Sequence, residues 1–153
     1  MALSPGSQAP DFSLRSQTGS EVRLSDATRD HVVVLYFYPR DETPVCTAEA
    51  CAFRDSYDVF KQAGAEVIGV SADPVERHSA FAAHHRLGFI LLSDPDGAVR
   101  RLYGVNDVIP LLMPGRETFV IDRDRIVRHR FSSQLRAKAH VREALLVVKK
   151  LAR

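Results

Sequence analysis

The stretch VVVLYFYPRDETPVCTAEAC, residues 32–51, contains an apolar run followed directly by both cysteines of the chain. The run Val32–Tyr38 has the length and the β-branched and aromatic content of a buried strand. Pro44 suits the first position of a helix, and Thr43 before it is a good N-cap residue. The stretch therefore predicts a buried strand that leads through a short loop into a helix, with Cys46 in the first turn.

The position of Cys46 predicts a reactive thiol. Unpaired backbone N–H groups and the helix dipole at a helix N-terminus favour the thiolate, which is the nucleophilic form of cysteine. Glu49 would add a negative charge near the positive end of the same helix. The alternative is that Cys46 is a small buried apolar side chain, a common role for a free cysteine. The second cysteine close by favours the reactive interpretation.

Cys46 and Cys51 are five residues apart, and this spacing restricts how they can react. On one continuous helix their Cα atoms would be roughly 8–9 Å apart, whereas a disulfide needs less than about 7 Å. A bond between them therefore requires the helix to unwind locally. A zinc site would need four ligands with tight Cys or His spacing, and a thioredoxin-like oxidoreductase would show Cys-x-x-Cys. The segment shows neither pattern.

The residues from Pro39 to Cys46 resemble the Pro-x-x-x-Thr-x-x-Cys signature of peroxiredoxins, the cysteine-dependent peroxidases. The position of Cys51 is similar to that of the resolving cysteine in the bacterioferritin comigratory protein, or PrxQ, subfamily. The resemblance covers nearly the whole chain and also includes Pro10–Phe12, Val70–Asp73 and Arg116–Asp122. It implies a thioredoxin-like fold and a peroxidase that needs no metal, haem or flavin.

The resemblance also implies a role for each residue of the site. Cys46 attacks the peroxide and becomes a sulfenic acid, which Cys51 then converts into an intramolecular disulfide. The Thr43 hydroxyl, the Cys46 N–H and an arginine from a distant strand hold the thiolate and orient the peroxide. Pro39 shields the pocket from water, and Glu49 braces the active-site loop.

Arg116 is the arginine that the resemblance selects, because it stands two residues before the strand predicted at Thr118–Ile121. Its guanidinium would stabilise the thiolate and the charge on the departing oxygen. Arg40, which lies inside the signature, is the competing candidate. Three site residues also have structural interpretations: Thr43 as an N-cap, Pro39 as the end of a strand and Glu49 as a charge in the first turn of the helix.

The whole chain predicts an α/β protein with a thioredoxin-like fold: a central mixed β-sheet flanked by helices, preceded by an N-terminal β-hairpin, in a single domain of residues 1–153. The hairpin is expected from 11–14 and 21–24, around a turn at 17–20. The other strands are expected at 32–38, 66–71, 89–92, 118–121 and 126–131. The helices are expected at 44–62, 75–86 (ending near Gly88), 98–103 and from Lys138 onward.

The loop from Val105 to Gly115 is poorly periodic and carries an apolar patch, Val108–Met113. The loop is expected to fold onto the core of its own chain. As alternatives, the patch could cover the active site, pack on the hairpin or form a dimer contact. The histidines, including the pair His84 and His85, lack metal spacing with one another or with the cysteines. They are interpreted as surface or packing residues.

Composition bounds the remaining possibilities. The chain has 153 residues, of which 45% are hydrophobic, and 21 basic against 19 acidic residues give a net charge of +2. These values suit one compact domain and give no support to nucleic-acid binding. No apolar run approaches the roughly 20 residues that span a bilayer. We expect a cytoplasmic protein that does not bind membranes, in a reducing compartment where a close cysteine pair is more often catalytic or metal-binding than structural.

The expected function is that of a thiol-dependent peroxidase acting on hydrogen peroxide and small organic hydroperoxides. The resemblance implies reduction by thioredoxin or a glutaredoxin-like dithiol protein, and a monomer. One alternative is a non-enzymatic redox sensor or relay, in which the switch between Cys46 and Cys51 alters a partner surface. A general disulfide reductase has less support, because the Cys-x-x-Cys spacing is absent.

Overall fold

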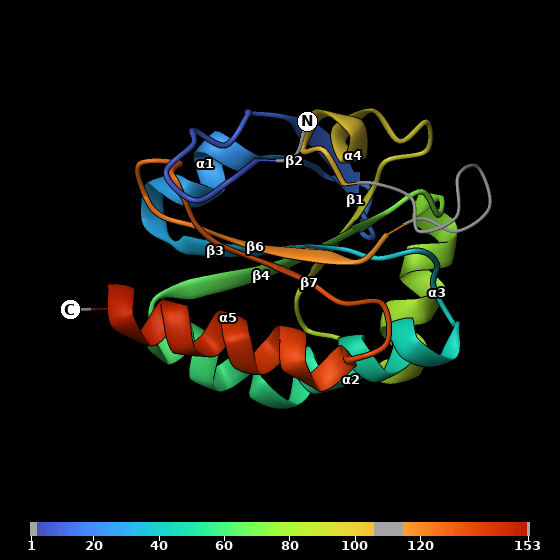
Figure 1. The fold of residues 1–153 in the computed structure, drawn as a ribbon. Coiled ribbons are helices and arrows are strands. Elements are labelled where there is room, and N and C mark those ends of the chain that lie inside the picture. Colours follow the sequence, from blue (N-terminus) through green and yellow to red (C-terminus); the bar gives the residue numbers. More distant parts are fainter. Residues whose placement is uncertain (1–2, 106–114, 153) are drawn as a thin grey trace.

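The computed structural model describes residues 3–105 and 115–152, with a seven-stranded sheet between layers of helices (Figure 1). The strands are β1 Ser13–Ser16, β2 Glu21–Arg23, β3 Val32–Phe37, β4 Ala65–Ser71, β5 Ile90–Ser93, β6 Glu117–Ile121 and β7 Val127–Ser132. The helices are α1 Leu24–Asp30, α2 Pro44–Gln62, α3 Val75–His85, α4 Ala98–Leu102 and α5 Ala137–Leu151. The predicted patch Val108–Met113 lies outside the described residues.

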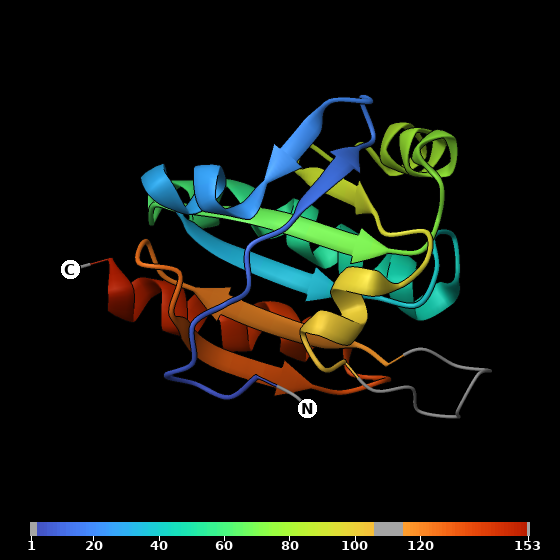
Figure 2. The same ribbon diagram turned by 90° about the horizontal axis from the view of Figure 1, so that it is seen from above.

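The strands follow the order β2-β1-β5-β4-β3-β6-β7 across the sheet (Figure 2). β3, β4 and β5 are parallel, while β6 and β7 on one side and the β1–β2 hairpin on the other are antiparallel. The sheet is therefore mixed, and the predicted fold class is confirmed, including the hairpin at the start of the chain.

β3 is buried along its whole length because its alternate side chains enter two different cores. Val34 and Tyr36 pack in the core that α2 and α5 cover, and Leu35 and Phe37 pack in the core on the opposite face. Figure 1 shows α2 and α5 below the sheet and α1 and α4 above it. A continuous apolar run is what a central strand covered on both sides requires.

The predicted hairpin strand that ends at Leu24 is wrong at that residue, because Leu24 begins helix α1. The Asp11 carboxylate accepts hydrogen bonds from the backbone N–H groups of Ser25, at 2.8 Å, and of Phe12. Asp11 thus supplies a cap for the helix from outside it, since α1 has no side-chain bond from its own N-cap residue. A cap from 14 residues earlier leaves no local signal in the sequence.

The other predicted elements agree with the observed ones to within two residues at each end. β3 ends at Phe37, one residue before the predicted end at Tyr38. Helix α3 ends at His85, where Arg86 takes a left-handed conformation with φ 54°. The helix therefore ends before the stop predicted near Gly88, because Arg86 takes the left-handed position that glycine usually occupies.

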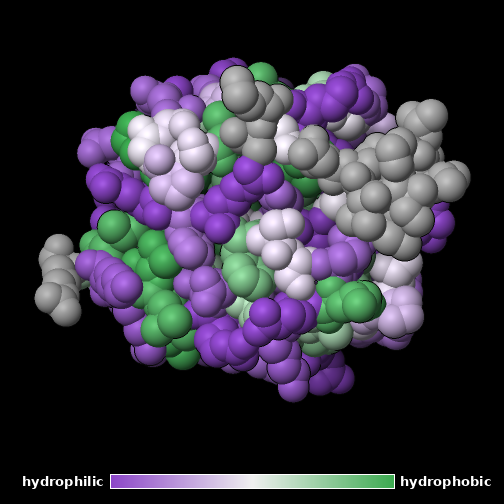
Figure 3. Space-filling model, in the orientation of Figure 1, coloured by the Kyte–Doolittle hydropathy of each residue, from purple (hydrophilic) through white to green (hydrophobic). Residues whose placement is uncertain are grey.

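On the face shown in Figure 3, apolar side chains lie in separate areas between hydrophilic ones, one of them over the C-terminal part of α5. The large hydrophobic side chains with most exposure are scattered over the chain: Val59, Leu102, Leu135 and Leu146. Within residues 3–105 and 115–152, no helix is both long and apolar enough to cross a membrane.

Gly69 in β4 makes room for the ring of Tyr36 on the neighbouring strand. The two residues are register partners, and a Cβ atom at Gly69 would lie 2.8 Å from Tyr36 Cζ. We expect Gly69→Ala to lower the free energy of unfolding by about 1–3 kcal/mol, because the buried ring must shift. Chemical denaturation measures the change. Gly88→Ala is the control, since its Cβ would meet Tyr57 at 3.6 Å, and equal effects of the two variants would contradict the prediction.

Candidate active site

The topology of the sheet brings Arg116 to Cys46, although 70 residues separate them. β3 ends at Phe37 and leads through a short loop into α2, whose first turn contains Cys46. β6 runs antiparallel to β3, with Glu117 opposite Phe37, so the start of β6 lies beside the end of β3. Arg116, directly before β6, is therefore delivered to the N-terminus of α2.

The guanidinium of Arg116 joins the sulfur to a buried carboxylate. Nη2 lies 3.2 Å from Cys46 Sγ, and Nη1 donates a hydrogen bond of 2.5 Å to Glu49 Oε1. Nε donates to the carbonyl of Gln134, which fixes the plane of the group. All three side chains are buried, with relative exposures of 1% for Cys46, 3% for Arg116 and 0% for Glu49. A fixed cation at this distance favours a thiolate.

Burial strongly affects how these groups ionise. Loss of solvent raises the pKa of Glu49 to about 7, against the opposing effect of Arg116. For Arg116, burial works against the charged form, but Glu49 and Cys46 outweigh it and raise the pKa above the ordinary arginine value. Arg116 is thus a permanent cation between two groups that can each carry a negative charge.

Glu49 does not act as a charge on the first turn of α2. The first turn contains no acidic residue, and the Glu49 side chain lies one turn further on, directed into the core. That structural interpretation of Glu49 is therefore wrong, and its partner is Arg116.

Pro39 and Thr43 lie on the solvent side of this arrangement. Together with Arg116 they line a groove of about 290 Å³, whose walls are largely apolar and are completed by Pro44, Val45, Gln134 and Leu135. Thr43 is the N-cap residue of α2, as predicted, but its side chain makes no capping bond and donates instead to the Arg40 carbonyl at 2.8 Å. The Thr43 oxygen therefore keeps its lone pairs for another donor.

Cys51 lies on the same unbroken helix as Cys46, and both thiols are free. Cys51 is half-buried, two turns into α2. Arg54 lies beside it: a hydrogen bond with Asp55 is the main cause that raises the pKa of Arg54, and an interaction with Cys51 adds to the effect. A cation near the second sulfur is a feature that the sequence analysis did not identify.

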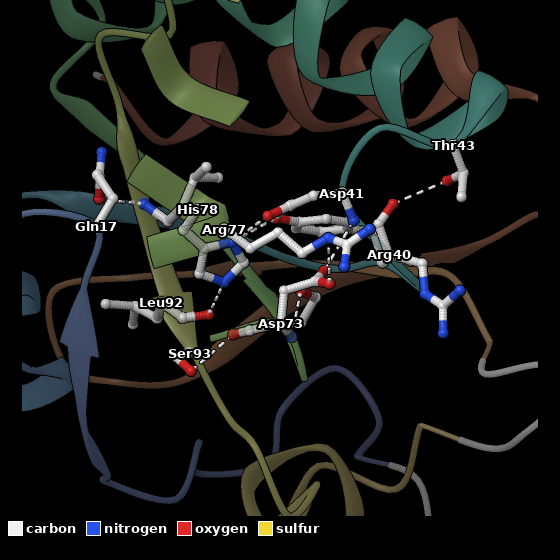
Figure 4. Close-up of polar contacts among 12 residues, drawn as sticks. Gln17, Arg40, Asp41, Thr43, Asp73, Arg77, His78, Leu92 and Ser93 are labelled. Atoms are coloured by element: carbon white, nitrogen blue, oxygen red, sulfur yellow. Dashed lines mark hydrogen bonds and ion pairs between the residues drawn. The ribbon is translucent and has the colours of Figure 1, made fainter. Parts of the chain in front are cut away.

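A buried polar network holds the loop between β3 and α2 (Figure 4). Asp41 accepts a hydrogen bond of 2.5 Å from the Tyr38 hydroxyl and lies 2.6 Å from His78 Nδ1, on α3. Its backbone N–H donates to Asp73 Oδ2, which follows β4. The other ring nitrogen of His78 is 2.9 Å from the Leu92 carbonyl and donates to it. The loop that carries Pro39 and Thr43 is thereby tied to β5 and α3.

Two groups of side chains in the described residues have geometry that a metal ion could use. Glu42 lies 2.8 Å from both His84 Nδ1 and His85 Nε2 at the surface, and Asp41, Asp73 and His78 form the buried group described above. In both groups the histidines already contact carboxylates at hydrogen-bond distance. The sequence analysis treated these histidines as surface or packing residues and did not anticipate their contacts with the active-site loop.

The structure thus brings together the residues that the sequence selected: Cys46, Arg116, Glu49, Pro39 and Thr43. Arg40, the competing candidate, is exposed, and only its carbonyl contacts the site through Thr43. The sequence analysis missed His140, which is fully buried and lies 3.5 Å from Glu49 Oε2. Its place on the inner face of the predicted C-terminal helix was the available signal, but nothing local connects it with a cysteine so much earlier in the chain.

Known proteins are similar to this chain in sequence and in fold. The model of the AhpC/TSA family matches residues 5–130. Chloroplastic peroxiredoxin Q of Triticum aestivum is 46% identical over 149 residues, which cover 97% of this chain and 68% of the relative. The crystal structure of peroxidoxin BcpB from Mycobacterium tuberculosis has a TM-score of 0.89 at 42% identity, covering 96% of this chain and 97% of that one.

A further solved structure, a cysteine-to-serine mutant of PrxQ from Xylella fastidiosa, gives a TM-score of 0.90 at 27% identity and covers 100% of this chain and 99% of that one. The thioredoxin-like fold of peroxiredoxins, expected from the sequence, is therefore confirmed. The long matches in sequence and structure agree in one assignment: the chain belongs to the AhpC/TSA family, among the PrxQ peroxiredoxins, which are thiol peroxidases.

Proposed function

We propose that Cys46 is the peroxidatic cysteine of this peroxidase and that Cys51 resolves its sulfenic acid as an intramolecular disulfide. The observation that carries the proposal is the 3.2 Å contact between Arg116 Nη2 and Cys46 Sγ, in a buried site at a helix N-terminus. No other cysteine is available, since the chain contains two.

In the first step the Cys46 thiolate attacks the terminal oxygen of a hydroperoxide. The O–O bond breaks, the sulfur becomes a sulfenic acid, and the remaining fragment leaves as an alkoxide or hydroxide that takes up a proton from water. Arg116 stabilises the charge on the thiolate and on the oxygen that leaves. Thr43, whose hydrogen is engaged by the Arg40 carbonyl, accepts the hydrogen bond of the peroxide O–H.

The groove beside Arg116 suits the organic part of a hydroperoxide. Its lining is mostly apolar and includes Leu135, which is 79% exposed, and Val45. An exposed leucine next to a reactive site provides apolar surface that an alkyl group can cover. Pro39 lies on the same groove and restricts the access of water to the sulfur. We therefore propose organic hydroperoxides, in addition to hydrogen peroxide, as substrates.

In the second step the Cys51 thiol attacks the sulfenic acid, forming the disulfide and releasing water. Because α2 is unbroken between the two cysteines, its first turns must unwind for the sulfurs to meet. A disulfide formed by unwinding is exposed to a dithiol protein, and we propose thioredoxin or a glutaredoxin-like protein as the reductant.

We also propose that the protein acts as a monomer in the cytoplasm. The scattered exposed hydrophobic residues do not form one large patch on the described surface, which supports a monomer. The plant relatives are named as chloroplastic proteins, so the compartment of this chain needs a direct test by fractionation. Sedimentation at several concentrations tests the monomer.

Cysteine substitutions separate the two proposed roles. Cys46→Ser should abolish peroxide consumption, because the nucleophile is lost. Cys51→Ser should still react once and turn over with a small thiol, but it should lose turnover with thioredoxin, thioredoxin reductase and NADPH. NADPH oxidation measures the cycle. Wild-type cycling by Cys51→Ser would exclude it as the resolving residue, and a single turnover by the wild type would favour the redox sensor.

Arg116 and Arg40 provide a matched pair. Arg116→Met should lower the second-order rate constant for peroxide by about 10²-fold or more, because a preorganised cation at the reacting atoms is lost. Arg40→Met should change it little, since that side chain is exposed. Stopped-flow oxidation of the thiol measures both, and Arg116→Lys tests whether charge alone suffices. Equal losses in the two methionine variants would contradict the assignment of Arg116.

Hydrogen exchange tests the unwinding of α2. Amides of residues 44–54 should exchange faster in the disulfide form than in the dithiol form, because their helical hydrogen bonds break when the disulfide forms. Amides of β4 in the central sheet should be equally protected in both forms and serve as the internal control. Equal protection of 44–54 in the two forms would show that the disulfide does not require unwinding.

A further inference from the structure

One oxygen of the buried Glu49 carboxyl group has no hydrogen-bond partner among the described residues. Oε1 is held by Arg116, but Oε2 is fully buried and unpaired. His140 Nδ1, on α5, lies 3.5 Å from it. An unpaired charged oxygen in the interior costs free energy, so the pairing of Oε2 needs an explanation.

The hydrogen bonds of His140 fix one of its two nitrogens as a donor. Nε2 lies 2.7 Å from the Ser133 carbonyl, which can only accept, so Nε2 carries a hydrogen. Nδ1 lies 2.7 Å from the Thr118 hydroxyl. In a neutral imidazole this nitrogen is an acceptor, so the Thr118 hydroxyl donates to it, and its lone pair would repel an ionised Glu49 oxygen. A second proton on His140 is opposed by burial and by the nearby positive charge of Arg116, which lower its pKa to about 4.

The charges of the site also favour a proton on Glu49. If the Cys46 thiolate and an ionised Glu49 were both present, two buried anions would share one cation, Arg116. Among the described residues, Tyr36 of β3 also faces them; its pKa is raised by burial and then by Glu49 and Cys46, so it stays neutral. His140 is neutral as well. A proton on Glu49 removes the excess negative charge.

We propose that Glu49 is held as a neutral carboxylic acid whose Oε2–H is directed at Nδ1 of His140, an acceptor that it shares with the Thr118 hydroxyl, and that this leaves the positive charge of Arg116 to the Cys46 thiolate. The step rests on the proposed role of Cys46. His140 is then a positioning residue, because it acts on the sulfur only through Glu49 and Arg116. A shift of about 0.6 Å brings Oε2 and Nδ1 to full hydrogen-bond distance.

The pH behaviour follows from the direction of the Glu49 shift. Its pKa, raised to about 7 by burial, keeps the acid form below that pH and releases the proton above it. Ionised Glu49 then competes with the sulfur for Arg116. The rate constant for peroxide should therefore fall as the pH rises through about 7 and Glu49 ionises.

The test compares wild type, Glu49→Gln and His140→Gln by stopped-flow oxidation of Cys46 with hydrogen peroxide from acidic to alkaline pH. The amide of Glu49→Gln mimics the acid, since its oxygen accepts from Arg116 and its NH2 donates to His140. This variant should react on the acidic side and lack the falling limb. In His140→Gln, which keeps a donor for Ser133, the limb should move to lower pH by about one unit or more.

Two results would overturn the proposal. A loss of rate in Glu49→Gln at every pH, like that of Arg116→Met, would show that the carboxylate anion is required. A uniform loss in His140→Gln, with an unshifted limb, would show a merely structural role. His129→Gln is the control, because His129 pairs with Glu143 on the surface of α5, away from Glu49. Its profile should match the wild type.

Infrared spectroscopy tests the proton without using the peroxidase activity. The reduced wild type should show the carbonyl stretch of a protonated carboxylic acid at acidic pH, which disappears as the pH rises through the raised pKa of Glu49, about 7, and is missing in Glu49→Gln. Absence of the band in folded wild-type protein would refute the neutral acid, even if the protein is an active peroxidase. Presence of the band in a protein without peroxidase activity would leave the acid in place and refute the proposed function instead.

Discussion

The site depends on one buried cation. Arg116 lies between Cys46 Sγ and Glu49 Oε1, and it is 3% exposed. A guanidinium cannot lose its proton in the interior, so the groups around it must supply the compensating negative charge. The distribution of that charge between the sulfur and the carboxyl group determines how much of the cation acts on the reacting atom. The antiparallel pairing of β3 and β6 is what delivers Arg116 there, so the central sheet and the chemistry are linked.

The loop between β3 and α2, which lines part of the groove, is held in place by a second buried pair. Asp41 and His78 are 2.6 Å apart and 0% exposed at their side chains, and Tyr38 completes the contact from the end of β3. Asp73 holds the Asp41 backbone from the end of β4. The peptide that precedes α2 is thereby attached to two parallel strands and to α3. Thr43 and Pro39 depend on this support, although neither contacts His78 directly.

Much of the site could be predicted because its residues lie in one short signature after one strongly apolar strand. The range from Pro39 to Cys51 contains the proposed nucleophile, its neighbour on the helix and the N-cap, and a strand of β-branched residues leads into it. The partners that could not be derived locally come from far along the chain. Asp11 caps α1 from 14 residues away, His78 meets Asp41 across 37 residues, and His140 approaches Glu49 from the last helix. Such contacts depend on the register of strands and the docking of helices, which the local pattern does not encode.

The unbroken course of α2 through both cysteines has a consequence for damage by excess oxidant. In the proposed cycle, the helical hydrogen bonds that present Cys46 to Arg116 are the same bonds that must open before Cys51 can arrive. A firmer first turn lengthens the life of the sulfenic acid and gives a second peroxide molecule time to convert it irreversibly to a sulfinic acid. A looser turn shortens that life but weakens the presentation of the sulfur. The stability of the first turn of α2 thus limits both the rate of turnover and the resistance of the enzyme to inactivation by excess oxidant.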